Sequence, residues 1–143
     1  MTHHDAGSYA AKHPTESIDP HIAEAVKAGT VRGEFSCSQA EKVALKMQVA
    51  MEKVGATLDL LEIRIARCQL GLFGHEPEGR IVKRAASVSP EMEKAVRQAL
   101  VDDRLPCAAA WSIAQRFALP RPDVASACEA LEIKIKPCQL GAF

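Results

Sequence analysis

The sequence lacks the motifs by which common enzyme classes are recognised. It has no Gly-rich phosphate loop, no HExxH and no GxSxG. Of its five histidines, only His21 falls within the internal repeat of the chain, and the matching position in the other copy is Glu91. A duplicated histidine-dependent site is therefore excluded, and the sequence predicts a protein that is not an enzyme.

Charge of one sign and long hydrophobic runs are also missing. Lys and Arg together number 18, as do Asp and Glu, so no strong global field would draw the chain to nucleic acid or to a membrane. No apolar run approaches the roughly 18 residues that a transmembrane helix needs, and the first residues have no apolar secretory segment. We therefore expect a cytoplasmic protein with no membrane partner.

What the sequence does contain is an internal duplication. Residues 17–73 align with residues 87–143 at a constant offset of 70, without a gap, and 18 of the 57 positions are identical. Both copies end on the pattern CQLGxF. Units of this size are too small for a secure core, so we expect the two repeats to pack on each other with pseudo-two-fold symmetry. We also expect a disordered tail at 1–16 and a linker at 74–86.

Each repeat has the pattern of three helices followed by a strand. Asp19 before Pro20 is an N-cap followed by proline at the first helical position. A second helix is expected to start at Cys37, and a third carries apolar residues at Val54 and Leu58. The alternation in EIRI and EIKI predicts a β-strand at the end of each repeat.

This order of elements resembles the winged helix-turn-helix proteins. Their pattern places a small residue in one helix, a tight turn about four residues later and a β-branched core residue about ten later. Ala44, Gln48 and Val54 have that spacing, and it recurs 70 residues further on. The chain thus resembles a tandem winged helix-turn-helix protein, which implies a mainly α fold with short β wings.

The resemblance implies a DNA-binding transcriptional regulator that binds double-stranded DNA. The third helix would enter the major groove, and the wing would contact phosphates. The basic residues at these places are Lys53 and Arg121 on the third helices, and Arg64, Arg67, Lys134 and Lys136 on the strands.

The third helix is nevertheless poor in side chains that read bases. Its expected groove-facing positions in the first repeat are Met51, Glu52, Lys53, Gly55, Ala56 and Asp59. Each repeat also has seven basic and seven acidic residues, so counterion release would be small. The alternative is a protein-protein adaptor that keeps the helix-turn-helix scaffold without DNA affinity.

Four cysteines allow a further alternative, a redox or metal sensor. In each repeat one cysteine starts the second helix and one follows the strand, so the two are expected to be neighbours. The residues are Cys37, Cys68, Cys107 and Cys138. They would form redox pairs or, if the repeats meet there, one site for zinc or an iron-sulfur cluster. The competing interpretation is that they are buried small hydrophobes copied with the repeat; Cys128, which replaces Leu58, is expected in the core.

Trp111 marks a difference between the repeats. It stands where the first repeat has Glu41, which would not be buried unpaired. We therefore expect Trp111 to pack on the other repeat or on a second chain, as a surface for a protein partner or a homodimer.

Overall fold

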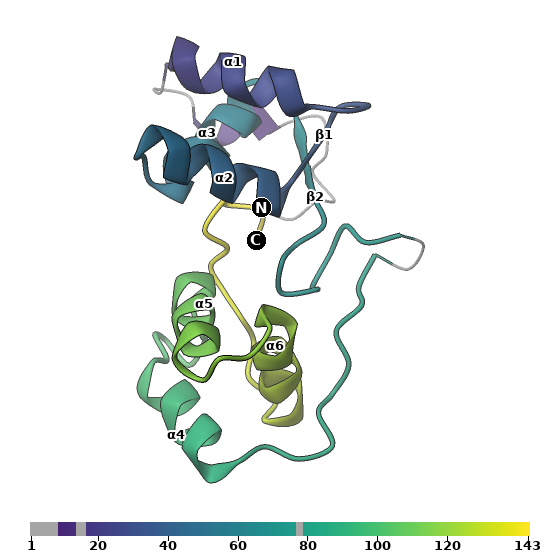
Figure 1. Ribbon diagram of the computed structural model, residues 1–143, viewed down its shortest axis with the longest axis vertical. Helices are drawn as coiled ribbons and strands as arrows, with labels where there is room; N and C mark the ends of the chain where they lie inside the picture. Colours follow the sequence, from purple (N-terminus) through teal and green to yellow (C-terminus); the bar gives the residue numbers. More distant parts are fainter. Residues whose placement is uncertain (1–8, 14–16, 77–78) are drawn as a thin grey trace. The chain divides into compact units, whose positions relative to one another are not determined.

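The structure, a computed structural model, describes residues 9–13, 17–76 and 79–143. Within these ranges the chain is mainly helical, with six α-helices and one two-stranded parallel sheet (Figure 1). It divides into two compact units, one formed by Met1–Cys68 with Gln139–Phe143 and the other by Gln69–Cys138. Unit 1 thus contains the closing residues of the second repeat, and unit 2 contains the closing residues of the first.

Unit 1 is built around three helices and a pair of strands. Its elements are η2 (Tyr9–Lys12, a 3-10 helix), α1 (Pro20–Gly29), β1 (Glu34–Ser36), α2 (Cys37–Met47), α3 (Met51–Leu60) and β2 (Arg64–Ala66). Asp19 caps α1 as expected, because its carboxylate accepts from the backbone amides of His21 and Ile22. Ser36 caps α2 in a capping box with Gln39, so α2 begins at Cys37.

The two strands of unit 1 run parallel. Phe35 pairs with Ile65 at the centre of the ladder, so the segment before the second helix pairs with the strand after the third. Ile63 and Ile65 are buried, whereas Arg64 is exposed, as the alternation predicts. The two strands are not neighbours in sequence, and so this sheet is not a hairpin.

Unit 2 repeats the three helices without a full strand pair. Its helices are α4 (Pro90–Gln98), α5 (Cys107–Arg116) and α6 (Arg121–Ala130). The strand predicted from EIKI is wrong, because only a single parallel bridge joins Leu105 to Ile135. The Leu105 amide donates to the Lys134 carbonyl over 2.9 Å and the Lys136 amide to the Leu105 carbonyl over 2.8 Å, but among the described residues the Arg64–Gly33 hydrogen bond of unit 1 has no counterpart. Ile133 and Ile135 are buried all the same.

Left-handed backbone conformations recur at the same places in both repeats. Gln48 and Ala118, the expected turn positions between the second and third helices, have φ of 55° and 54°. Glu62 and Glu132, after the third helix, have φ of 56° and 59°. None of these four residues is glycine, the residue that adopts this conformation most easily. The turn geometry therefore recurs with the duplicated fold and could not be recognised from glycine in the sequence.

The expected disordered tail at 1–16 contains a short helix. Tyr9–Lys12 form η2, and Ala10 and His13 bond to the end of α3. Residues 1–8 and 14–16 lie outside the described residues, as do residues 77–78 of the expected linker.

Helix α3 lies at the centre of unit 1. Val54 and Leu58 form its expected apolar face and are fully buried. Gly55, on another face, lies against the backbone of Leu140: a Cβ added at Gly55 would meet the Leu140 carbonyl oxygen and would lie 2.7 Å from its carbonyl carbon. Glycine is therefore retained inside this helix because it permits the backbone of another segment to approach closely.

Replacing Gly55 with alanine tests this packing. Helix propensity alone predicts that Gly55→Ala stabilises the protein by about 1 kcal/mol. We expect the opposite, a loss of about 1–3 kcal/mol, because the Leu140 backbone must move. Urea unfolding followed by circular dichroism measures it. The matched control is Ala125→Gly at the equivalent place in α6, which should cost about 1 kcal/mol; a stabilised Gly55→Ala variant would show that Leu140 does not pack there.

Candidate functional site

The third helix of unit 1, where DNA contact was expected, is buried on most of its surface, and that of unit 2 is buried on one face. In α3 the buried residues are Met51, Val54, Gly55, Ala56, Thr57, Leu58 and Asp59. Four of these, Met51, Gly55, Ala56 and Asp59, were expected to face a DNA groove, and that expectation is wrong. In α6 the side chains of Val124, Ala125, Ala127 and Cys128 are buried. The helix is thus a central packing element of its unit.

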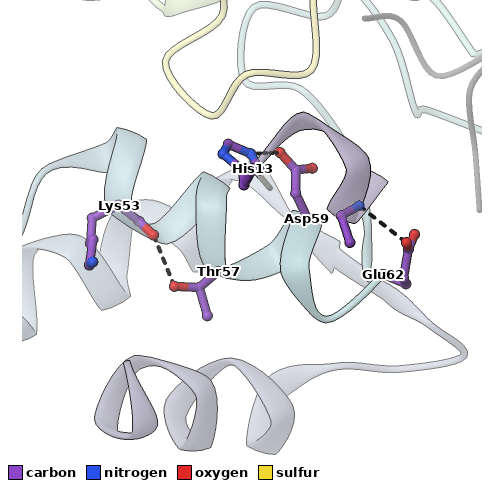
Figure 2. A network of polar contacts seen from close by, with 6 residues as sticks. His13, Lys53, Thr57, Asp59 and Glu62 are labelled. Carbon is purple, nitrogen blue, oxygen red and sulfur yellow. Dashed lines mark hydrogen bonds and ion pairs between the residues drawn. The ribbon is translucent and has the colours of Figure 1, made fainter. Parts of the chain in front are cut away.

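The segment that precedes the first helix covers one part of α3. The His13 imidazole Nε2 lies 2.8 Å from Oδ2 of Asp59, and the Ala10 amide donates to the Glu62 carboxylate over 3.1 Å (Figure 2). Only 3% of Asp59 is exposed. A buried carboxylate is costly unless it is paired, so the bond from His13 accounts for the burial of an acid on this face.

An equivalent segment covers α6 in unit 2. Arg80 forms an ion pair with Glu129, the counterpart of Asp59, and Arg84 lies 3.5 Å from Glu132, the counterpart of Glu62. The amide of Ala85 donates to the Ser126 carbonyl over 3.1 Å. We call residues 9–13 and 80–85 the leader segments. Both leader segments pair with the same two acidic positions on or just after the third helix.

The closing residues of the two repeats provide a second cover. Leu140 lies against Gly55 of α3 in unit 1. In unit 2, Gln69 of the first CQLG accepts a hydrogen bond of 2.7 Å from the guanidinium of Arg121, the first residue of α6, and Leu70 is fully buried. Each third helix is therefore completed by the CQLG segment of the other repeat.

The basic residues proposed for DNA contact divide into two groups. Lys53, Arg64 and Arg67 in unit 1 are exposed, as are Lys134 and Lys136 in unit 2. Arg121 is half-buried and already holds Gln69. Of the six residues, the five in the first group are thus accessible to a ligand, and Arg121 has a structural role in its unit.

Of the four repeat-related cysteines, Cys37 and Cys107 begin α2 and α5, Cys68 follows β2, and Cys138 follows the bridged residue Ile135. Cys37, Cys68 and Cys107 are buried and Cys138 is half-buried, and none is in a disulfide. In unit 2 the Cys107 amide donates to the Pro137 carbonyl over 3.0 Å, which brings the residue before Cys138 to the start of α5. Among the described residues no three His, Cys, Asp or Glu side chains are grouped closely enough to hold a metal ion.

Cys128 is a core thiol, as expected from its place opposite Leu58. Only 1% of it is exposed. Burial, with a smaller contribution from the nearby charge of Glu129, raises the pKa of the Cys128 thiol to about 11. The thiol is therefore protonated at neutral pH and is a poor nucleophile.

Trp111 forms a small cluster with Arg121 in unit 2. The Arg121 guanidinium carbon lies 3.7 Å from the centre of the indole ring, a cation-π contact. The indole N–H is buried and has no hydrogen-bond partner among the described residues. Gln69 bonds to the same guanidinium, so Gln69, Arg121 and Trp111, the tryptophan cluster, connect a closing segment to α5 and α6.

Several of these packing residues were missed from the sequence. His13 gave no motif, Leu140 was noted only as part of CQLGxF, and Gly55 and Asp59 were assigned to an outer face. One signal was present: Asp59 and Glu129 keep an acid at the same place of both repeats. An acidic residue kept at a position that was expected to approach DNA phosphates indicates contact with a basic side chain instead. His13 and Arg80 of the leader segments are these side chains.

Comparison with known proteins gives no relative: no family model, no curated protein and no solved structure matches this chain.

None of the helices in the described part of the chain is long and apolar enough to cross a membrane.

The raised pKa of Cys128 predicts slow alkylation in the folded protein. A thiol with a pKa of about 11 has about 100-fold less thiolate at pH 8 than one with the usual value of 9.0. We expect iodoacetamide to modify half-buried Cys138 first and Cys128 last, as measured by mass spectrometry of the digested protein. The reference is the urea-unfolded chain, where all five cysteines should react alike; equal rates in the folded chain would contradict the burial.

The same raised pKa predicts that Cys128 lowers the free energy of unfolding at high pH. The unfolded chain loses this proton near pH 9 and the folded chain only near pH 11, so stability is full below about 9 and falls as the pH rises towards about 11. Cys128→Ala should show less of this alkaline loss than wild type when urea midpoints at pH 8 and 10.5 are compared. An unchanged loss would assign it to other groups.

The tryptophan cluster predicts a spectroscopic signature, because Trp111 is the only tryptophan. Arg121→Met introduces the residue found at the equivalent position of α3. We expect a shifted Trp111 emission maximum and a loss of about 1 kcal/mol in unfolding free energy from the lost cation-π contact. Arg104→Met, at an exposed position of the same unit, is the control. Identical emission from both variants would contradict the stacking.

Proposed function

We propose that this protein is a non-catalytic protein-protein adaptor on a tandem helix-turn-helix scaffold, the alternative left open by its sequence. The observation that carries the proposal is the burial of α3, the third helix of unit 1. In a DNA-binding helix-turn-helix unit the recognition helix must present side chains to base edges in the major groove. Here Gly55, Ala56 and Asp59 of α3 are inside unit 1.

Freeing α3 for a DNA groove would require the leader segment and the closing segment to leave it. Re-exposing the buried Leu140 side chain alone costs about 2–3 kcal/mol. The buried Asp59 would then lose its contact with His13 and approach phosphates of the same charge. Both effects oppose groove binding by α3.

The tryptophan cluster is the surface that best fits a protein partner. Tryptophan and arginine are the residues most enriched among those that dominate protein interfaces. Trp111 and Arg121 are half-buried and stacked, so they are ordered before a partner arrives, and little side-chain entropy is lost on binding. The second repeat is apolar here, whereas the first repeat has Glu41 at the equivalent position.

DNA binding by exposed basic residues that follow the third helices is the second candidate function. It is favoured by the exposure of Arg64, Arg67, Lys134 and Lys136, none of which has an ion-pair partner among the described residues. Four such residues would contact phosphates without reading bases. This mode predicts weak binding that depends on salt and is insensitive to sequence.

The cysteine sensor has the least support. Three of its four thiols are buried, and no three potential ligands lie together in the part of the chain that the structure describes. A buried thiol is shielded from oxidants. We therefore assign the repeat-related cysteines to packing.

A paired experiment separates the adaptor from the DNA-binding protein. Genomic duplex fragments, including the DNA upstream of the protein's own gene, are titrated with the protein at 50 and 200 mM salt, and anisotropy is measured. An adaptor should show no DNA complex at protein concentrations up to about 10 μM, a concentration at which many DNA-binding proteins already bind non-specifically. A phosphate-binding protein should show affinity that falls with a log-log salt slope near −3.6 for four contacts, and should lose it in the Arg64, Arg67, Lys134 and Lys136 quadruple alanine variant.

The partner itself is sought by quantitative affinity capture with two variants. Trp111→Glu introduces the residue of the first repeat and should lose the partner, by about 10-fold or more for an interface centred on tryptophan. The quadruple alanine variant should retain it. If Trp111→Glu captures the same proteins as wild type while remaining folded, the tryptophan cluster is not the adaptor surface.

A further inference from the structure

The contact between the closing segment and α3 joins residues that are far apart in the chain. We call Gln139–Phe143 the closing segment of unit 1. Its Leu140 is buried, and the Leu140 backbone lies directly on α3 at Gly55. The remainder of the second repeat up to Cys138 belongs to unit 2. Five residues at the end of the second repeat are therefore packed as part of a unit whose helices come from the first.

The same exchange occurs in the other direction. Gln69, the first residue of unit 2, bonds to α6, and Leu70 is fully buried. Both closing segments have the sequence Gln-Leu-Gly-x-Phe. Each unit is thus a receptor for one copy of this pattern, and the pattern is supplied by the repeat that does not provide the receptor helix.

Nothing in the contact requires that receptor and segment belong to one chain. The contact at Gly55 is made by the backbone of Leu140 and is accompanied by burial of its side chain, which an identical segment from another molecule reproduces. Exchange of an identical element between two copies of a chain is a low-cost route to a dimer. Within one chain the segment is held at an effective concentration on the order of millimolar, so the intramolecular form is favoured in dilute solution.

We propose that the α3 surface around Gly55 is a binding site for the closing segment Gln139–Phe143 of a second copy of this chain. Two copies exchange these segments reciprocally and form a dimer that keeps every contact of the monomer. The partner is a second copy because the recognised sequence is present in the chain itself. This proposal concerns self-association and goes beyond the adaptor function, since it does not involve the tryptophan cluster.

Two full-length variants test the exchange by complementation. Gly55→Val blocks the receptor and leaves the closing segment intact, whereas Leu140→Asp blocks the segment and leaves the receptor intact. Each variant alone should be monomeric by light scattering at about 100 μM, because every copy in the sample lacks the same one of the two elements that must bind each other. An equimolar mixture should contain a one-to-one heterodimer, because each chain supplies what the other lacks. Two folded variants that stay monomeric when mixed would overturn the proposal.

A peptide experiment decides the question if Gly55→Val does not fold, as circular dichroism would show. A fluorescent peptide with the sequence of residues 135–143, IKPCQLGAF, is titrated against the Leu140→Asp chain, or against Leu140→Ala if the aspartate variant unfolds. We expect saturable binding that weakens at least about 10-fold when the peptide's leucine is replaced by aspartate, since a charge would be buried. Equal binding of the two peptides, or no binding, would refute exchange. Neither result depends on whether the protein binds DNA or an adaptor partner.

Discussion

The close packing of Leu140 on Gly55 is the contact on which the rest of unit 1 depends. It places a polypeptide backbone against a helix, where any side chain beyond hydrogen would collide with the Leu140 carbonyl. Helix α3 is then packed on three sides: its apolar face is buried, Leu140 lies on Gly55, and His13 bonds to Asp59. A helix covered in this way serves as the centre of a unit, and its polar residues are recruited to hold neighbouring segments.

The sequence resembles a helix-turn-helix protein, but the helix that this resemblance assigns to DNA is packed inside unit 1. The second and third helices follow each other through a left-handed residue in both units, at Gln48 and Ala118. In unit 1 the leader segment and the closing segment lie on α3, and in unit 2 Arg80, Arg84 and Gln69 bond to residues on or just after α6. The basic residues Lys53, Arg64, Arg67, Lys134 and Lys136 are exposed, and the stacked pair Trp111 and Arg121 is half-buried. We propose the pair for a protein partner and, as the second candidate, the exposed residues for phosphates. Function is consequently sought at these places and not on the third helices.

Local sequence signals predicted the helices well, because they depend on a few neighbouring residues. Asp19 and Ser89 cap the first helices, and the second helices start at Cys37 and Cys107, as expected. The alternation in EIKI predicted buried isoleucines correctly but a strand wrongly. A strand needs a run of ladder hydrogen bonds, and in unit 2 the pairing is limited to the single bridge between Leu105 and Ile135. Periodicity identifies a buried face but does not supply hydrogen-bond partners.

The sequence by itself determined the duplication, the helix starts, the turn positions and the apolar face of each third helix, because these follow from residue spacing and local capping. Only the tertiary structure decided what covers the opposite face. Small and acidic residues such as Gly55 and Asp59 are compatible with solvent, with DNA or with a packed segment, and periodicity does not distinguish these. The outcome depended on segments more than forty residues away in sequence, His13 and Leu140, whose contacts arise from folding the whole unit.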